Sequence, residues 1–193
     1  DGRGILLTTT QCLLSTTRNS DMTQDKIEQF LLQELGLKKI LWLNHGALIG
    51  DDTDAHIDTL ARFCSVDTIA YVKCKDSHDF HYQTLKRMED ELKEFKNLSG
   101  KKYKLVALPM PDACYDQIGN RLPATYANFL LVNDGVLVPS YGVKQDQEAL
   151  DNIQNIFPKR KVIGVDCLPL IQQNGSLHCI SMQYPSAVKI MLE

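Results

Sequence analysis

The feature that most constrains the fold of this chain is an internal repeat of about 60 residues. The pattern Thr-x-Ala-x-Phe occurs at residues 59–63 and again at 125–129, which is 66 positions later. Around both copies the same order recurs, with two short apolar runs, an amphipathic helical pattern and a third apolar run. Such a period is typical of propellers and repeat arrays, whose units stack to bury their faces. About two and a half to three units fit in the chain; the alternative is one α/β sandwich with coincidental spacing.

Apolar periodicity predicts three helices and a set of short strands. The helices are expected at residues 23–35, 85–95 and 149–156; the first carries Ile27, Phe30, Leu31 and Leu35 at helical spacing before Gly36. Strands are expected at 5–10, 39–43, 59–63, 68–72, 103–108, 126–132, 136–138 and 161–165, and a further strand carries Cys179 before a short apolar tail. The fold class is therefore α/β, with repeated strand, strand, helix, strand units.

Composition excludes several classes of protein. Of the 193 residues, 44% are hydrophobic and 23% are charged, as in an ordinary globular protein. The net charge of -3 does not favour nucleic acid or an anionic membrane, although an acidic cleft would suit a cationic ligand. No apolar run approaches the roughly 20 residues of a membrane span, and a signal-peptide pattern is absent.

The six cysteines indicate a reduced, cytoplasmic protein. Their spacing is irregular and contains no Cys-x-x-Cys pair, which argues against a zinc site. They stand at Cys12, Cys64, Cys74, Cys114, Cys167 and Cys179. The chain begins at Asp1, directly before a predicted strand, and we interpret it as a fragment or a processed chain.

The residues with the clearest chemistry lie in an acidic stretch at 50–59. This stretch places four carboxylates and one imidazole between apolar runs. On a strand, His56 and Asp58 would project to the same side with Asp54 behind them. A histidine flanked by carboxylates can serve as acid and base for a thiolate, so Cys179, in the segment 175–181, is the natural partner.

Other interpretations of the same residues remain open. Asp51, Asp52 and Asp54 also fit a capped turn, a solvated loop or a divalent-metal site, although the stretch lacks the ligand placement of a calcium loop. A lone cysteine on a strand is usually a small buried hydrophobe. His178 is expected on the opposite face of the Cys179 strand, in a structural role.

Several segments, in this order along the chain, resemble the agmatine deiminase and bacterial peptidylarginine deiminase group. They are residues 4–9, 12–19, 42–46 (Trp-Leu-Asn-His-Gly), 50–58 (Gly-Asp-Asp-Thr-Asp-Ala-His-Ile-Asp), 122–129 (Leu-Pro-Ala-Thr-Tyr-Ala-Asn-Phe) and 175–180 (Gly-Ser-Leu-His-Cys-Ile). The resemblance implies the pentein fold, a propeller of five ββαβ units. About three units would be present here, so residues 1–193 would form the C-terminal part of a single catalytic domain.

The resemblance also implies a role for each matching residue. Cys179 would be the nucleophile, His56 the general acid and base, and Asp58 a carboxylate that grips a guanidinium. Asp52 and Asp54 would be substrate-binding residues together with Asp58, Asp54 in an outer-shell or structural role, and no metal or cofactor is implied. The family's N-terminal part would supply a second guanidinium-binding carboxylate. Departures from the family pattern are Asp52 in place of the common Glu, Ala55 in place of the common Gly, and Ser176 in a turn that is often richer in glycine.

The function implied by this resemblance is hydrolysis of agmatine to N-carbamoylputrescine and ammonia, through a covalent cysteine thiouronium intermediate. The expected setting is cytoplasmic polyamine and putrescine biosynthesis, with a small cationic substrate, no nucleic acid or membrane partner, and a possible homo-oligomer. The alternatives are a peptidylarginine deiminase of the same fold, a metal-dependent hydrolase, and a non-catalytic pentein binding module.

Overall fold

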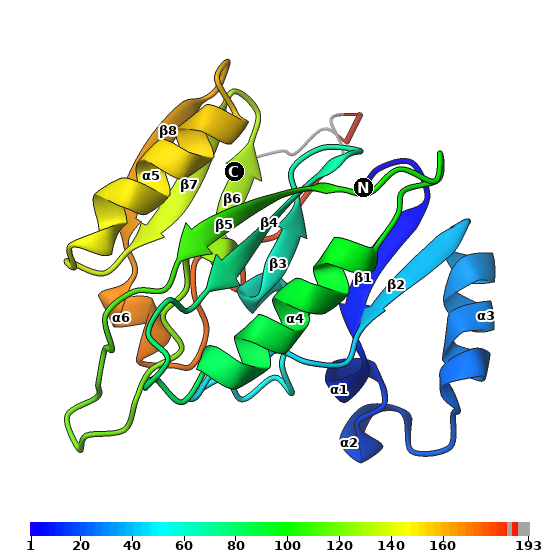
Figure 1. Ribbon diagram of the computed structural model, residues 1–193, viewed down its shortest axis with the longest axis horizontal. Coiled ribbons are helices and arrows are strands. Elements are labelled where there is room, and N and C mark those ends of the chain that lie inside the picture. The colour runs from blue at the N-terminus through cyan, green and yellow to red at the C-terminus, as the bar shows by residue number, and fades with distance from the viewer. Residues whose placement is uncertain (185–186, 189–193) are drawn as a thin grey trace.

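The computed structural model describes residues 1–184 and 187–188, and within them the chain forms three separate β-sheets (Figure 1). The first sheet pairs β1 (Ile5–Thr9) with β2 (Lys39–Leu43) in parallel. The second contains β3 (Ala61–Phe63), β4 (Thr68–Lys73) and β5 (Lys104–Pro109). The third contains β6 (Leu130–Val132), β7 (Gly135–Ser140) and β8 (Lys161–Asp166). Most of the predicted apolar tail lies outside the described residues.

The second and third sheets repeat one arrangement. In each, the first strand pairs antiparallel with the middle strand, and the middle strand pairs parallel with the last. A helix connects the two parallel strands, so the predicted strand, strand, helix, strand order is present in both units. β1 occupies the middle-strand position of the first unit, because it pairs parallel with the strand that follows the helix. The three sheets do not close into a ring, and the five-unit propeller stays a prediction.

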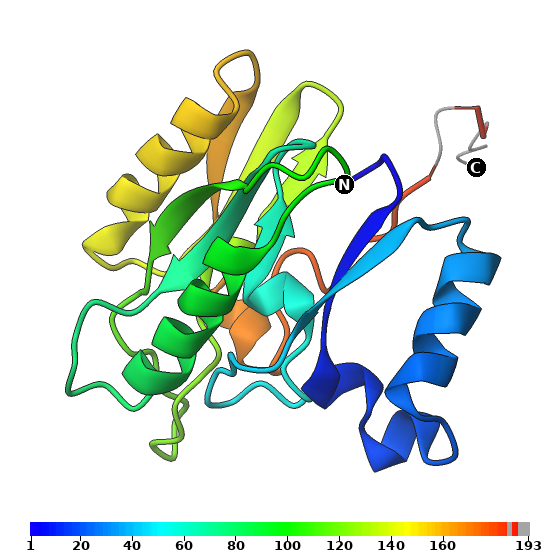
Figure 2. The ribbon, with the colours of Figure 1, turned by 45° about the vertical axis from the view of Figure 1, so that its right-hand side comes forward.

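The three long helices lie outside the sheets (Figures 1 and 2). They are α3 (Gln24–Glu34), α4 (Tyr82–Glu94) and α5 (Gln145–Ile156). α4 packs against β4 and also against β2, and α5 packs against β8 and also against β5. Each of these two helices therefore joins its own sheet to the preceding one. No helix among the described residues is long and apolar enough to cross a membrane.

Two hydrophobic cores meet at the second sheet. The first core gathers side chains of β1, β2, β4 and α4, and the second gathers those of β7, α5 and the short helix α6 (Leu168–Ile171). Alternate residues of β4 belong to different cores, since Ile69 and Tyr71 lie in the first and Ala70 in the second. Each large apolar side chain buried in this way contributes about 1.5–3 kcal/mol to stability. Burial of both faces of β4 thus holds neighbouring units together.

The predicted strands are wrong at three places, and all three belong to the candidate site. The 3₁₀ helix η1 (Ile57–Thr59) replaces the beginning of the strand expected at 59–63, and η2 (Tyr126–Asn128) replaces that at 126–132. Thr125 caps η2, because its Oγ1 accepts a hydrogen bond from the Ala127 amide. The segment 177–180, expected as a strand, is a turn.

The remaining short helices, α1 (Thr10–Leu13) and α2 (Thr16–Asn19), follow β1 directly. Thr9 caps α1 by accepting a hydrogen bond from the Cys12 amide, and Ser15 caps α2 in the same way through the Thr17 amide. These caps turn the chain back beside the acidic loop at 50–56.

Candidate active site

The acidic loop begins with a glycine that no other residue can replace without a clash. Gly50 has a φ of +85°, and a Cβ built on it would lie 2.5 Å from the Arg121 carbonyl oxygen. Asp54 and Ala55 also have left-handed φ values, of 62° and 58°. This conformation is costly for residues with a side chain, so it persists only where other contacts impose it. One such contact is the hydrogen bond of 2.9 Å from Thr9 Oγ1 to the Ala55 carbonyl oxygen.

Asp58 is the centre of the site. Its Oδ1 lies 2.7 Å from His56 Nδ1 and its Oδ2 lies 2.8 Å from His178 Nδ1, and its side chain is only 10% exposed. An ionised carboxylate can only accept hydrogen bonds, so both imidazoles donate through Nδ1. Each ring therefore keeps its Nε2 for other partners.

Electrostatics keep the Asp58 carboxylate ionised. Burial alone would raise the pKa of Asp58, but the hydrogen bonds from His178 and His56 outweigh it and hold that pKa well below its usual range. The hydrogen bond to Asp58 in turn raises the pKa of His56, against the opposing effect of burial. His56 is therefore well suited to carry a proton near neutral pH.

His56 and Asp58 meet for a different reason from the predicted one. Neither residue lies on a strand: His56 is the residue that precedes η1, and Asp58 lies within it. The Thr59 side chain donates a hydrogen bond of 2.9 Å to the His56 carbonyl oxygen and closes the turn. The tight turn, rather than strand alternation, brings the imidazole onto the carboxylate.

Cys179 lies in the turn at 177–180, exposed at the surface of the described chain. Its Sγ is 3.6 Å from Asp58 Oδ2, so the structure brings together the predicted cysteine, histidine and aspartate around one carboxylate. Partial desolvation raises the pKa of the Cys179 thiol, and the Asp58 charge adds to this, against hydrogen bonds from the Ser176 backbone and from Asn128.

His178 is the clearest correction to the sequence prediction. It was expected on the opposite face of a strand from Cys179, but in the turn both side chains contact Asp58 Oδ2. The chain direction changes at each residue of a turn, so the alternation of a strand does not apply there.

Asn128 is a site residue that the sequence analysis did not single out. Its side chain is fully buried at the end of η2. Its Nδ2 donates to the Asp58 carbonyl oxygen at 3.2 Å and to Cys179 Sγ at 3.4 Å, and its Oδ1 accepts from the His178 amide at 2.7 Å. The available signal was a polar amide between Ala127 and Phe129 in a buried segment, since a buried amide needs partners.

The other acidic residues of the loop turn away from Asp58. Asp54 Oδ2 lies 3.8 Å from Arg18 Nε, and Asp52 Oδ2 accepts a hydrogen bond of 3.4 Å from Asn174 Nδ2. Asp51 Oδ1 accepts from the Thr53 amide at 3.0 Å, as in a capped turn. Asp52, which is exposed, therefore lies where the acidic loop meets the Cys179 loop.

A hollow of about 290 Å³ adjoins this group. Arg62 lies in its wall, donates a hydrogen bond to the Phe129 carbonyl oxygen and places its guanidinium 4.8 Å from the centre of the Phe129 ring. The lining residues come from β1, η1, β3 and the Cys179 turn: Asp1, Ile5, Leu6, Leu7, His56, Ile57, Asp58, Ala61, Arg62, Phe63 and His178.

Comparison with known proteins identifies the family of this chain. Residues 1–185 match the family model described as "Porphyromonas-type peptidyl-arginine deiminase". The chain belongs to this family. A curated relative from Legionella pneumophila (strain Paris), named "Putative agmatine deiminase", is 36% identical over 191 residues, which are 98% of this chain and 55% of the relative.

Solved structures of deiminases have the same fold. A structure titled as the "Putative Arginine Deiminase from Porphyromonas gingivalis" is 53% identical with a TM-score of 0.94, over 96% of this chain and 55% of the other. An agmatine deiminase of C. jejuni with substrate bound is 44% identical with a TM-score of 0.86, over 92% and 51%. The chain thus spans about half the length of these deiminases.

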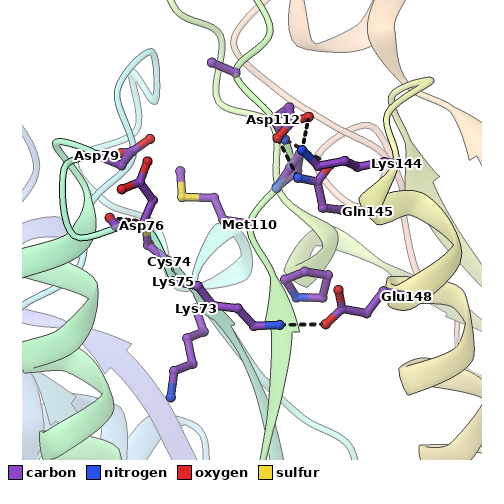
Figure 3. A pocket seen from close by; sticks show the side chains of 13 residues that line it. Lys73, Cys74, Lys75, Asp76, Asp79, Met110, Asp112, Lys144, Gln145 and Glu148 are labelled. Atoms are coloured by element: carbon purple, nitrogen blue, oxygen red, sulfur yellow. Dashed lines mark hydrogen bonds and ion pairs between the residues drawn. The ribbon is translucent and has the colours of Figure 1, made fainter.

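A second cleft, of about 630 Å³, is separate from the site around Asp58 (Figure 3). It lies at the ends of β4 and β5, facing the first turn of α5, and shares no lining residue with the hollow beside Asp58. Two ion pairs cross it, with Lys75 Nζ 3.0 Å from Glu148 Oε1 and Lys144 Nζ 3.3 Å from an Asp112 carboxylate oxygen. These pairs link the second unit to the third.

Proposed function

We propose that the protein containing this chain, called the full-length protein below, is a guanidine deiminase that converts agmatine to N-carbamoylputrescine and ammonia. The observation that carries the proposal is the convergence of the Cys179 thiol and the His56 imidazole on the buried Asp58 carboxylate. Membership of the deiminase family supports it. A guanidinium is planar, and each of its sides presents two parallel N–H donors. This geometry matches the two oxygens of a carboxylate that is held in a fixed plane.

The first half-reaction begins when the guanidinium binds Asp58. Burial raises the pKa of Cys179 and the Asp58 charge adds to this; the bound cation offsets that charge, so the thiol loses its proton to solvent water more readily. The thiolate attacks the central guanidinium carbon and forms the C–S bond. Protonated His56 donates its proton to one amino nitrogen, the C–N bond breaks, and ammonia leaves a thiouronium on Cys179.

The second half-reaction restores the enzyme. Neutral His56 removes a proton from a water molecule, whose oxygen adds to the thiouronium carbon. The C–S bond then breaks, the electron pair returns to Cys179 as thiolate, and the Asn128 amide, 3.4 Å from Sγ, donates a hydrogen bond to that sulfur. The proton of the new hydroxyl group passes through solvent water to the thiolate, which restores the thiol. The ureido product is neutral, so its attraction to Asp58 is weaker than that of the substrate and it dissociates.

Agmatine is the proposed substrate because it carries a second cation beyond its guanidinium. Asp52 offers an exposed carboxylate at the junction of the two site loops, where it could pair with the distant ammonium. An arginine residue within a peptide lacks that ammonium. Peptidylarginine is the second candidate, favoured by the description of the matching family model. An agmatine deiminase would belong to polyamine and putrescine biosynthesis, and we propose a cytoplasmic location.

Ammonia release from agmatine, free arginine and an arginine peptide tests the proposed function. The full-length protein should turn over agmatine with the highest kcat/KM, and a clear preference for the peptide would overturn the choice of substrate. A chelator should leave the rate unchanged, whereas inhibition by chelator would favour a metal-dependent hydrolase. Release of no ammonia from any of the three would favour a binding module.

We also propose that the full-length protein supplies elements that this chain lacks. β4 and β7 each have a strand on both sides, whereas β1 pairs with β2 alone among the described residues. The first unit therefore needs an antiparallel strand along the free edge of β1, and Asp58 alone grips only one side of a guanidinium. Both would come from the N-terminal part of the same catalytic domain.

The isolated 193-residue chain should consequently have little or no activity. Loss of one charged clamp costs about 2–4 kcal/mol of transition-state stabilisation, which lowers the rate by roughly 30- to 900-fold. Agmatine turnover measured on a sample whose intact mass is 21.8 kDa checks this expectation. Full turnover by that single species would contradict it.

Alkylation should single out Cys179 among the cysteines. Cys167 is fully buried, and burial raises the pKa of Cys64 to about 11, so neither should react quickly. Because the pKa of Cys179 is also raised, its reaction with iodoacetamide should be slow at pH 7 and should accelerate as the pH rises.

A cationic reagent provides the matched comparison. Chloroacetamidine should alkylate Cys179 faster at neutral pH than chloroacetamide does, because its amidinium can pair with Asp58 and offset the charge beside the thiol. Peptide mapping by mass spectrometry identifies the labelled residue. Labelling of Cys64 or Cys167 with Cys179 spared would show that the proposed nucleophile is wrong.

A further inference from the structure

Hydrogen bonds hold both the backbone and the ring of His178. Its amide donates to the Asn128 side chain at 2.7 Å, and its carbonyl oxygen accepts from Ser181 Oγ at 2.7 Å. Its Nδ1 lies 2.8 Å from Asp58 Oδ2. The backbone and the ring of His178 are therefore held at once, and the ring is aimed at the carboxylate.

The two histidines divide the Asp58 carboxylate between them. His56 donates to Oδ1 and His178 donates to Oδ2, so the carboxylate is bound at both ends and cannot rotate without breaking a hydrogen bond. Each carboxylate oxygen has two lone pairs, so Oδ1 keeps one for a ligand, and the second on Oδ2 becomes free when the Cys179 thiol, whose Sγ is 3.6 Å away, loses its proton. A planar, bidentate ligand such as a guanidinium requires both remaining lone pairs to lie in a fixed plane.

We propose that His178 is a positioning residue, which holds the Asp58 carboxylate in the plane that receives the guanidinium and shares that carboxylate with His56. The inference rests on the proposed function for its ligand, but the sharing of Asp58 between two imidazoles does not depend on turnover.

Loss of His178 should change both substrate binding and the titration of His56. Without the second donor, Asp58 can rotate away from the guanidinium, which weakens binding. Its charge is then shared with His56 alone, so the hydrogen bond to His56 strengthens and the pKa of His56 moves upward. The other charged groups near His56 are Arg18 of α2 and Asp51 of the acidic loop, and neither is altered.

Three variants of the full-length protein test the proposal. His178→Phe removes the donor; His178→Asn restores one, because the asparagine Nδ2 and the histidine Nδ1 are both attached to Cγ. His45→Phe is the matched control, since His45 also bonds a carboxylate, Glu91, at 2.7 Å, and its side chain is 39% exposed against 34% for His178.

His178→Phe should raise KM for agmatine about tenfold to a hundredfold, the usual effect of losing one hydrogen bond to a charged group. In the pH–rate profile of this variant, the limb that reports the titration of His56 should be shifted to higher pH. His178→Asn should stay within about threefold of the unchanged protein, as estimated from a retained hydrogen bond, and His45→Phe should match it. The proposal is overturned if His178→Phe leaves KM and the limb unchanged, or if His178→Asn is as impaired as His178→Phe.

Titration of the His56 ring by NMR, without substrate, separates this inference from the proposed function. An upward shift of the His56 pKa in His178→Phe, restored in His178→Asn, would support the shared carboxylate even if no guanidine compound were turned over. Absence of ammonia from every substrate would refute the deiminase function alone. An unchanged His56 titration in His178→Phe would refute the role of His178 alone.

Discussion

The Cys179→Ala variant of the full-length protein should release ammonia from agmatine at a rate on the order of 10⁴-fold or more below that of the unchanged protein. The substitution removes the atom that forms the covalent bond, and no neighbouring thiol lies against Asp58 among the described residues. The fold should persist, because Cys179 is exposed in a turn and its sulfur makes only long contacts of 3.4–3.7 Å. Ammonia release and thermal unfolding, measured on the same sample, check both parts.

Cys114→Ala is the matched control for this substitution. Cys114 is also a free cysteine outside the fully buried core, and its sulfur makes one long hydrogen bond of 3.7 Å to a backbone carbonyl. Its loss should leave turnover unchanged. Substantial ammonia release by Cys179→Ala, or an equal loss in Cys114→Ala, would remove the basis for covalent catalysis at Cys179.

Asp58→Asn should have two large effects in opposite directions. Deimination should fall by about 10²- to 10⁴-fold, because the guanidinium loses its charged partner and His56 loses the acceptor that raises its pKa. Alkylation of Cys179 by iodoacetamide at neutral pH should become faster, because burial still raises the thiol pKa but the carboxylate charge that adds to this effect is gone. A variant that is merely unfolded would also expose Cys64 and Cys167 to the reagent.

The surface pair of Asp76 and His78 provides the control. Asp76 Oδ1 lies 3.3 Å from His78 Nδ1 in an exposed loop, so Asp76→Asn removes a similar aspartate and histidine contact away from the site. It should alter neither deimination nor the rate of Cys179 alkylation. Slower alkylation of Cys179 in Asp58→Asn would contradict the electrostatic account.

Local sequence patterns predicted the secondary-structure elements whose formation depends on interactions between residues close together in the sequence. The three long helices lie within a few residues of their predicted ranges, because apolar spacing and end signals act over one or two turns. Leu85, Met88 and Leu92 of α4 are buried as expected. Phe30 and Leu35 were placed on the apolar face of the first helix but are 57% and 59% exposed. Periodicity identifies an apolar face, whereas its burial depends on what packs against it.

The sequence predicted which residues form the site, but not how they are arranged in space. His56, Asp58 and Cys179 were singled out from residue chemistry and family resemblance, and the structure brings them together. The reasoning from strand alternation failed, because these residues lie at a 3₁₀ helix and in a turn.

Contacts between distant parts of the chain decide the conformation of those turns. The amide of His178 bonds the side chain of Asn128, which is 50 residues away, and the His178 ring bonds Asp58 at a separation of 120 residues. No local propensity encodes such contacts. The roles of Asn128 and His178 therefore became visible only in three dimensions.

Trapping of the covalent intermediate tests the central claim most directly. The full-length protein would be mixed with agmatine that carries a radioactive label on its guanidinium carbon, quenched with acid during turnover, and digested for peptide mapping. We predict label on the peptide that contains Cys179, with a mass increase equal to agmatine minus ammonia, and no label in Cys179→Ala. Label on another residue, or ammonia release by Cys179→Ala at the unchanged rate with no labelled peptide, would contradict the account.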